Sequence, residues 1–428
     1  MTTLNYKLIL FFFLSGSPLF GQTDFIKDDN FSPVHCIGAV WDMVLLPSDE
    51  VLVCHTGISH YCTGVTDFSW ITMLNREDGQ INPEFSAPTA PPPYSGFNVL
   101  DNNIYLCQGS GRPIKFLSDG SIDQNWYSFS TLYFDSAMDI EWMSHDSSIV
   151  WSGSFFIEND PNIKPWFWDR RIPFVKFNKD GQLDHSNFNP PVIRLISGRD
   201  TIYMNESHFI SKFHDNSFIF STRGNLADDH RSDYGIFIMN NDGSIDTDFA
   251  TSSDIVEITE RDPISKFLIQ EDGKIVVFGR FKIDYQDQEL YTGMLRLHPN
   301  GDIDTTFNFQ NNVFLASQQP DPVTLIDQIV YDGLLLENDT MVFVGSFNQY
   351  QGFERGGVVM TDKDGNIVPG IFDGEGFKGE PFKPHGEGRH QLRSVAAPDS
   401  NTLFIGGYYS SFNGVYNSKP PGVVKLIR

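Results

Sequence analysis

Two stretches of the sequence carry side chains that could recognise a ligand. In the first, "IENDPNIKPWFWDRRIP" (157–173), Trp166 and Trp168 flank a phenylalanine, and Arg170 and Arg171 follow closely. An exposed tryptophan beside an arginine can stack on a sugar ring or contact a partner protein. The residues leave a second interpretation open, in which the aromatic side chains pack beneath the loop as a satellite core.

The second stretch is "KPHGEGRHQ" (383–391), where glycines separate His385, Glu387, Arg389 and His390. These side chains could bind an anion or a metal ion, or they could simply be solvated surface. No Cys/His spacing typical of a metal site is present, and the fingerprints of common hydrolases, metalloproteases, P-loops and dinucleotide folds are missing. We therefore expect no metal, no cofactor and no catalytic residues.

A third group of polar residues stands near the starts of apolar, strand-like segments, and its members are Asp42, Asp139, Lys266, Asp332 and Arg393. Carboxylates and cations brought together in this way could perform acid–base chemistry or bind a sugar or a polyanion. The alternative is that they only hydrate a water-filled opening. Which of these applies depends on the elements that position them.

The composition favours strands and turns. The 428 residues are 40% hydrophobic and 14% aromatic, with 36 glycines, so a large core of β-structure is expected. Acidic residues number 55 and basic residues 30, which gives a formal charge of −25. A chain this acidic repels phosphate backbones, so nucleic acid is a poor partner.

The N-terminus reads "MTTLNYK", then "LILFFFL", then "SGSPLFGQ". This order of a charged, an apolar and a small-residue region predicts a signal peptide over residues 1–21. The apolar run is too short to span a membrane as a helix. We expect residues 22–428 to form a single secreted domain, extracellular or periplasmic, with no membrane span.

Four cysteines, Cys36, Cys54, Cys62 and Cys107, lie in the first quarter of the chain. Export would permit disulfides, and Cys54–Cys62 closes the shortest loop, but the sequence cannot choose among the three pairings. Free buried thiols are an equal alternative, because Cys54 and Cys107 each end an apolar strand.

A repeat organises almost the whole chain. Six stretches share an apolar strand, an Asp-Gly or Asn-Gly turn, an aliphatic residue and an aromatic residue: "MLNREDGQINPEF", "KFLSDGSIDQNW", "KFNKDGQLDHSNF", "IMNNDGSIDTDF", "RLHPNGDIDTTF" and "VMTDKDGNIVPGIF". Their turn glycines are Gly79, Gly120, Gly181, Gly243, Gly301 and Gly365, where hairpins need a positive φ. A further hairpin precedes each, and a seventh occurs near the C-terminus. Two hairpins make a four-stranded unit, which predicts radial repetition.

Only the seventh unit lacks its own fourth strand, because "GVVKLIR" (422–428) matches a third strand. The mature N-terminus supplies a substitute: "FIKDDNFSPV" aligns with the internal "QLDHSNFNPPV", placing Ile26 with Leu183, Phe31 with Phe188 and Pro33 with Pro190. The alternative is a chance match in a disordered tail. We predict an all-β, seven-bladed β-propeller of four-stranded antiparallel blades, whose ring is closed by the mature N-terminal strand completing the last blade.

The doubled signature "QEDGKIVVFGRF" and "RLHPNGDIDTTF" resembles the delta-60 repeat β-propeller family of secreted bacterial proteins. The resemblance is strongest around residues 208–301. It implies a propeller and export, but no established chemistry, so it assigns no functional residue.

Two functions fit these expectations. The first is a monomeric, secreted binding or interaction module without catalysis, whose partner is an extracellular protein or a glycan bound on the face that carries the long, variable loops. The second is an extracellular carbohydrate-active enzyme that uses carboxylates at the mouth of the central channel. The channel-mouth candidates are the polar residues at the strand starts.

Overall fold

The structure is a computed structural model that describes residues 24–33, 40–55, 71–87, 97–100, 103–106, 114–126, 132–143, 148–157, 172–184, 188–190, 193–197, 200–202, 206–214, 217–223, 225–226, 234–249, 255–258, 264–285, 288–308, 330–379, 391–416 and 422–428. The regular elements of these residues are β-strands, apart from the short 3-10 helix η3 (Glu337–Asp339). The described part of the chain is therefore all-β, as its composition predicted.

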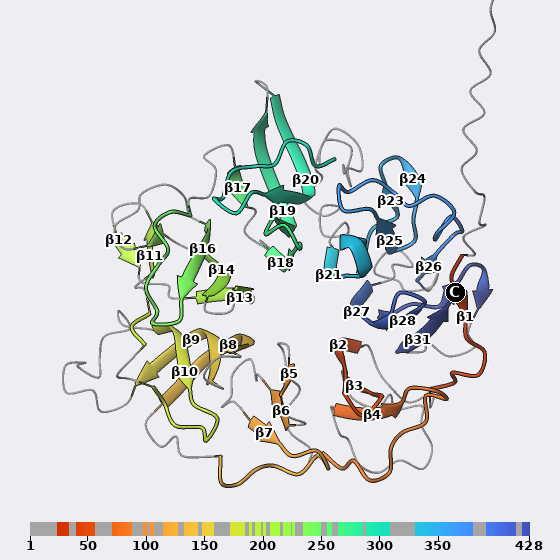
Figure 1. The fold of residues 1–428 in the computed structure, drawn as a ribbon, viewed down its shortest axis with the longest axis horizontal. Helices are drawn as coiled ribbons and strands as arrows, with labels where there is room; N and C mark the ends of the chain where they lie inside the picture. Colours follow the sequence, from red (N-terminus) through yellow and green to blue (C-terminus); the bar gives the residue numbers. More distant parts are fainter. Residues whose placement is uncertain are drawn as a thin grey trace, which may run out of the picture.

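The sheets lie side by side around a common centre, as Figure 1 shows. The strands nearest this centre are β2 (Val40–Leu45), β5 (Phe97–Leu100), β8 (Leu132–Met143), β13 (Glu206–His214), β18 (Ile264–Ile269), β21 (Val330–Leu335) and β27 (Gln391–Asp399). Each of them forms an edge of its sheet, so all these strands can contribute to one axial site.

Each inner strand pairs antiparallel with the strand that follows it: β3 (Glu50–His55), β6 (Asn103–Leu106), β9 (Ser148–Ile157), β14 (Ser217–Arg223), β19 (Ile275–Tyr285), β22 (Met341–Gly345) and β28 (Thr402–Tyr408). A third antiparallel strand lies outside these: β4 (Ile71–Asn75), β7 (Ile114–Phe116), β10 (Ile172–Phe177), β16 (Tyr234–Asn240), β20 (Gln288–Leu297), β25 (Val358–Thr361) and β31 (Val423–Ile427). The predicted order of strands within the repeat is confirmed to this extent.

Shorter strands occupy the connections. They are β11 (Ile193–Ser197), β12 (Asp200–Ile202), β15 (Asn225–Leu226), β17 (Ile255–Ile258), β23 (Gln349–Tyr350), β24 (Phe353–Glu354), β26 (Phe377–Lys378), β29 (Ser411–Phe412) and β30 (Val415–Tyr416). Strand β17 adds to the sheet of β18–β20, whereas the others form small sheets of their own.

The turn glycines of the repeat have the predicted left-handed backbone, with φ between +74° and +93°. Gly365 shows a second requirement besides conformation. A Cβ atom there would lie 2.8 Å from the ring of Phe307, which belongs to the preceding sheet. The turn must therefore lack a side chain so that the two sheets can approach each other.

The hydrophobic core lies between the faces of neighbouring sheets. One cluster joins Leu52 of β3 to Ile104 of β6, and another joins Val276 of β19 to Phe343 of β22. The aromatic residues that end the repeats are all buried, as the alignment predicts: Phe31, Phe85, Trp126, Phe188, Phe249, Phe307 and Phe372. Each unit therefore contributes one aromatic side chain to these layers.

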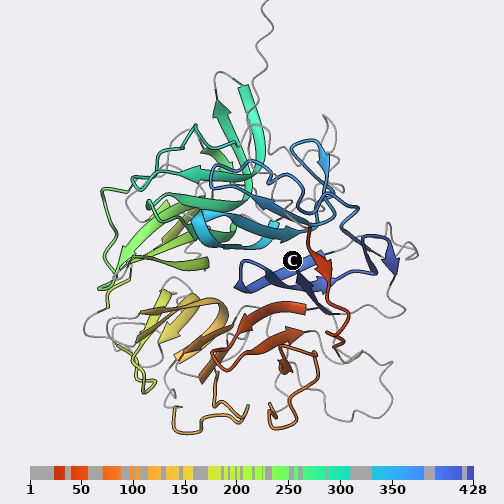
Figure 2. The same ribbon diagram turned by 45° about the vertical axis from the view of Figure 1, so that its right-hand side comes forward.

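The N-terminal strand β1 (Ile26–Lys27) pairs with β31 and completes a four-stranded sheet in the order β1-β31-β28-β27. Figure 2 shows β1 (red) running beside the C-terminal strands (dark blue). The predicted alignment is wrong by one residue here. In the third unit Leu183 lies opposite Phe177, and the residue that lies opposite the equivalent Leu426 is Lys27, not Ile26. Ile26 is exposed. The third unit has one extra residue before its phenylalanine, which caused the error.

Of the four cysteines, only Cys54 lies in the described residues, and it is a free, buried thiol. Burial raises the pKa of this thiol well above its ordinary value, with a further contribution from Asp42. Of the alternatives that the sequence left open, Cys54 is therefore the free buried thiol, and it packs as a small apolar residue. In the part of the chain described, no helix has the length and apolar character needed to cross a membrane.

Candidate functional site

Several inner strands share an irregularity that brings polar side chains toward the centre. It lies near the strand start in β2, β18, β21 and β27, but past the middle of β8, so Asp139 does not stand at a strand start as predicted. In β2, β8, β18, β21 and β27 the pairing register shifts across one residue, so a bulge separates an apolar residue from a polar one. A bulge re-aims the side chains next to it. The polar residues that follow the bulges are Asp42, Asp139, Lys266, Asp332 and Ser394.

Lys266 is the positive centre of this group. Its ammonium lies 3.1 Å from the carboxylate of Asp332. The pKa of Lys266 is raised chiefly by the charge of Asp332, against burial that lowers it, and further by Asp42 and Asp139. The structure therefore brings together four of the five residues predicted from the strand starts, and Lys266 stays charged.

The Asp332 and Asp42 carboxylates also connect neighbouring sheets. Asp332 Oδ2 accepts a hydrogen bond of 2.9 Å from the backbone N–H of Val395 in β27. The Ser394 hydroxyl lies 3.3 Å from Asp332 Oδ2 and 3.4 Å from Asp42 Oδ1, and it accepts from the N–H of Met43 at 3.1 Å. One polar cluster thus joins β21, β27 and β2, so these side chains are held rigidly.

Asp139 makes the equivalent connection between β8 and β13. Its two oxygens accept from the N–H of Ile140 at 2.8 Å and of Ile210 at 3.2 Å. Desolvation raises the pKa of Asp139 to about 7, opposed by these hydrogen bonds and assisted by the nearby charge of Glu141. This carboxyl therefore titrates near neutral pH, which is the range a general acid or base needs.

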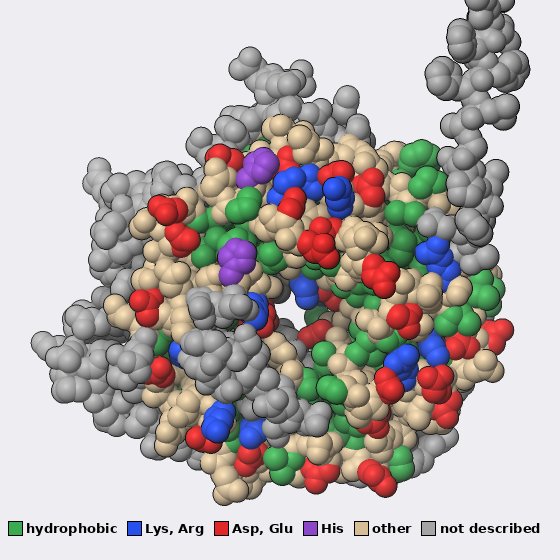
Figure 3. All heavy atoms as spheres, viewed as in Figure 1, with side chains coloured by type: hydrophobic (Ala, Val, Ile, Leu, Met, Phe, Trp, Pro, Cys, Tyr) green, Lys and Arg blue, Asp and Glu red, His purple; other side chains and the backbone are tan. Residues whose placement is uncertain are grey.

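Arg393, the fifth predicted residue, lies in a different environment. Its guanidinium carbon is 4.7 Å from the ring centre of Trp41 and 4.1 Å from that of Tyr331. Sequence reasoning missed both aromatic residues. The signal was present, because Trp41, Tyr331 and Arg393 each stand immediately before the polar residue of their strand. Figure 3 shows an opening at the centre of the molecule with Lys or Arg side chains at its edge.

The other predicted ligand-binding residues lie outside the described residues. These are Trp166, Trp168, Arg170 and Arg171 of the first loop and His385, Glu387, Arg389 and His390 of the second. They remain predictions. Within the ranges that the structure describes, no group of three or more His, Cys, Asp or Glu side chains is placed to hold a metal ion.

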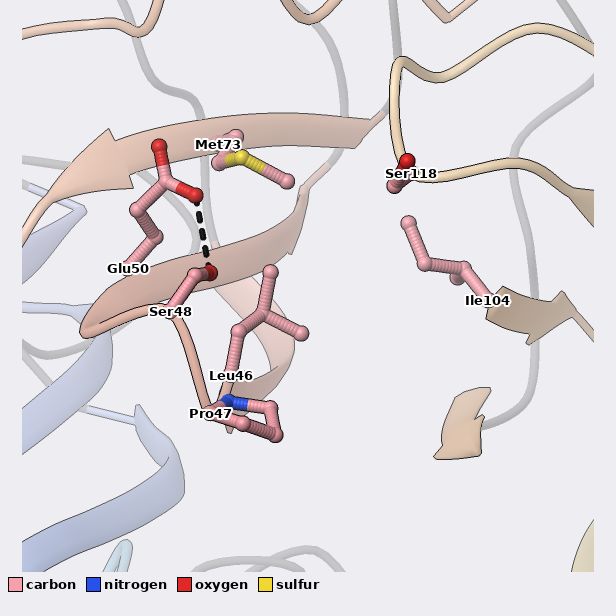
Figure 4. Close-up of a pocket in the computed structure, with 7 residues that line it drawn as sticks. All are labelled: Leu46, Pro47, Ser48, Glu50, Met73, Ile104 and Ser118. Atoms are coloured by element: carbon pink, nitrogen blue, oxygen red, sulfur yellow. Dashed lines mark hydrogen bonds between the residues drawn. The ribbon is translucent and has the colours of Figure 1, made fainter. Parts of the chain in front are cut away.

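A pocket that the sequence did not indicate lies between the first two large sheets. It has a volume of about 340 Å³ and is lined by Leu46, Pro47, Ser48, Glu50, Met73, Ile104 and Ser118. Figure 4 shows apolar side chains on both sides of the pocket and the Ser48 hydroxyl bonded to Glu50. The pocket lies beside the short turns that contain Ser48 and Ser118, so the face of the sheets that carries short turns also has a pocket.

The comparison with known proteins supports a β-propeller. Residues 270–307 match a family described as a domain of unknown function (DUF5122) beta-propeller. They include β19 and β20 and the repeat signature that follows them. No curated protein matches the chain. The described part of the chain is thus all-β, and residues 270–307 resemble a β-propeller repeat.

Two solved structures are distant in sequence. The computationally designed Ika8 protein has 10% identity and a TM-score of 0.47, with 93% of this chain and 98% of that chain covered. The extracellular domain of BT3049 from B. thetaiotaomicron, described as a hybrid two component system, has 10% identity and a TM-score of 0.43. That likeness covers 90% of this chain, which spans only 47% of the other chain.

Proposed function

We propose that the chain forms a seven-bladed β-propeller closed by its N-terminal segment. The support is that this segment repeats the contacts that internal units make with their neighbours. The N–H of Ser32 donates to the carbonyl of Asp78 at 2.9 Å, as the N–H of Ser86 donates to Asp119 at 2.9 Å. A Cβ on Gly79 would meet Phe31 and Pro33, just as one on Gly120 would meet Phe85.

On this fold we propose an exported binding or interaction module that has no catalytic activity. The observation that carries the proposal is the use of the inner carboxylates. Asp332 and Asp139 each accept hydrogen bonds from backbone N–H groups of a neighbouring sheet. These bonds hold both side chains in fixed positions and reduce their freedom to act as acid and base on a substrate. The remaining polar surface is rigid and suits recognition.

The face proposed for the ligand is the one where the inner strands begin and from which the long connections extend. The partner class is an extracellular protein or a glycan. We propose export from the N-terminal sequence pattern, and we propose that the domain is monomeric. The loop residues Trp166, Trp168, Arg170 and Arg171 are candidates for contact on this face.

One observation favours the alternative, a carbohydrate-active enzyme. A carboxyl whose pKa is about 7, as for Asp139, can donate a proton at neutral pH, which glycoside cleavage requires. A second carboxylate at a suitable separation would also be needed.

A glycan array probed with the full chain tests the proposal, followed by a reducing-end assay on every glycan that is retained. Retention without release of new reducing ends supports a binding module. Release that disappears in Asp139→Asn would replace the module with the enzyme.

A further inference from the structure

Three side chains from three sheets form a cluster of cation–π contacts at the axial opening. Arg393 of β27 lies between the rings of Trp41 in β2 and Tyr331 in β21. All three stand at the bulge of their strand, so they share one level along the axis. Two aromatic faces fix the plane of the guanidinium and thereby reduce the entropy that a ligand contact would cost.

Arg393 differs from other arginines of the described chain in what it binds. Arg296, Arg355 and Arg76 each form an ion pair with an aspartate. The acceptor found for Arg393 within the described ranges is the amide oxygen of Gln391, 3.0 Å from Nη2, and no carboxylate of those ranges pairs with it. In a chain of charge −25, an ordered arginine that pairs with no carboxylate of the described residues retains donors for an oxygen-rich ligand.

Trp41 supplies the second component. Trp41 is 39% exposed, whereas the aromatic residues that end the repeats, such as Phe31 and Phe307, are buried. The ring is fixed by Arg393 on one side and by its position in β2, so it presents a rigid apolar surface beside fixed donors. A flat C–H face together with oxygen acceptors is the chemistry of a sugar ring.

We propose that Trp41, Tyr331 and Arg393 form a subsite for one sugar ring at the mouth of the axial opening. The ring stacks on Trp41, and the guanidinium of Arg393 donates to a hydroxyl or to a carboxylate of the sugar. The subsite rests on the proposed binding function and names its ligand class. Lys266 lies nearby but is neutralised by Asp332, so it adds little net charge for the ligand.

The test is calorimetric titration of the full chain with two probes of equal length, a neutral β-glucan hexaose and a hexamer of galacturonic acid. We expect one probe to bind. Trp41→Ala should weaken that probe by about tenfold or more, whereas Trp41→Phe, which keeps a stacking face, should weaken it by about threefold or less. Arg393→Lys should weaken the galacturonate more than the glucan if a carboxylate is bound, because lysine lacks the planar fork.

The matched control is Phe353→Ala, which removes an aromatic ring that is 59% exposed and also lies beside an arginine, Arg355, but stands in β24. This variant should bind the probe as the wild type does. Melting temperatures verify folding, and an unfolded Trp41→Ala is replaced by the Trp41→Phe and Arg393→Lys pair. Wild-type affinity in Trp41→Ala, or no binding of either probe at about 10 mM, overturns the subsite.

The two proposals fail in different ways. Loss of binding in the loop variant Trp166→Ala with Trp168→Ala, with Trp41→Ala unaffected, overturns the subsite and leaves the module in place. Cleavage of the bound probe overturns the non-catalytic module, while the effect of Trp41→Ala on affinity would still support the subsite.

Discussion

The outer and inner strands of the sheets repeat to very different degrees. On the outer strands, a basic residue pairs with an aspartate of the segment that follows: Arg296 with Asp304, and Lys115 with Asp123. Lys425 at the C-terminal end pairs in the same way with Asp28, which comes from the N-terminal end of the chain. On the inner strands the polar positions after the bulges hold aspartate, lysine or serine, and their contacts differ: Asp332 accepts from the N–H of Val395, whereas Lys266 pairs with Asp332.

The fold constrains the outer positions more strongly than the inner ones. The outer pair also reaches the next sheet, since Arg296 bonds Asp364 and Lys425 lies 3.7 Å from Glu77. The outer pair recurs in units that carry a basic residue at this position, because their junctions have the same geometry, whereas Ile238 takes the place of the basic residue in one unit. The axial positions meet different neighbours across the opening, so they are free to vary and to carry specificity.

Removing residues 24–33 should have the largest effect on stability, because it removes the outer contacts at one junction. The deletion eliminates β1, the buried Phe25 and Phe31, and the partner of the buried Lys425. We expect Tm to fall by more than about 10 °C, because an uncompensated buried charge is added to the lost apolar contacts. Differential scanning calorimetry gives the measurement.

Ile26→Ala is the matched control for this deletion. Ile26 lies in the same strand but is 62% exposed. Its Tm should remain within about 2 °C of the wild type. An unchanged Tm in the deletion would show that the N-terminal segment does not close the structure.

Neutralising one outer aspartate should have the next largest effect on the free energy of unfolding. Asp304→Asn leaves the fully buried Arg296 without its closest counter-charge, although Asp364 remains nearby. We expect a loss of about 3 kcal/mol in the free energy of unfolding, measured by denaturant titration. Asp246→Asn is the control, because Ile238 occupies the basic position in its unit, and it should cost less than about 1 kcal/mol. Equal losses would mean that the outer pair is not what stabilises the junction.

A smaller effect should isolate the contact between a turn and the neighbouring aromatic residue. Gly365 and Gly370 have φ of +82° and +79°, but only a Cβ on Gly365 would meet the Phe307 ring. Alanine at either position incurs the cost of a left-handed backbone, about 1 kcal/mol. Gly365→Ala should cost about 1–3 kcal/mol more than Gly370→Ala, because it also overpacks the junction. The difference between their unfolding free energies measures this contact, and a difference of zero contradicts it.

The features that recur in every unit were predicted well from the sequence. Turn glycines, strand order and buried aromatic residues follow from local patterns, and residues such as Gly181 and Phe249 behave as their neighbours in other units do. The register of β1 was misjudged because the third unit contains an extra residue before Phe188. A pattern of residue types does not record where such an insertion lies.

For the inner strands, the sequence predicted which residue types are present but not the contacts between them. Asp42, Lys266 and Asp332 were recognised because they are charged residues at strand starts. The relation between Trp41, Tyr331 and Arg393 was missed, since it depends on bulges in three strands that are distant in the sequence. The pocket beside Glu50 was missed for a similar reason, because its walls come from two sheets.

The last comparison distinguishes the two regions by pH. Asp304 has a pKa held well below its ordinary value, because hydrogen bonds from Thr306 and the charge of Arg296 outweigh its desolvation. Its contribution to stability is therefore complete above about pH 4 and is lost as the pH falls below that value. Asp139 has the opposite sign, since its folded pKa is about 7 against an ordinary value of 3.8.

Between about pH 4 and 7 the folded chain keeps a proton on Asp139 that the unfolded chain releases, so the free energy of unfolding should decrease as the pH rises through this range. Asp139→Asn cannot titrate and should flatten that decrease, whereas the exposed Asp78→Asn should follow the wild type. Denaturant titrations at intervals from pH 4.5 to about 8 measure the slopes. Parallel curves for wild type and Asp139→Asn would show that Asp139 is ionised throughout, and the inner carboxylate would then behave as the outer ones do.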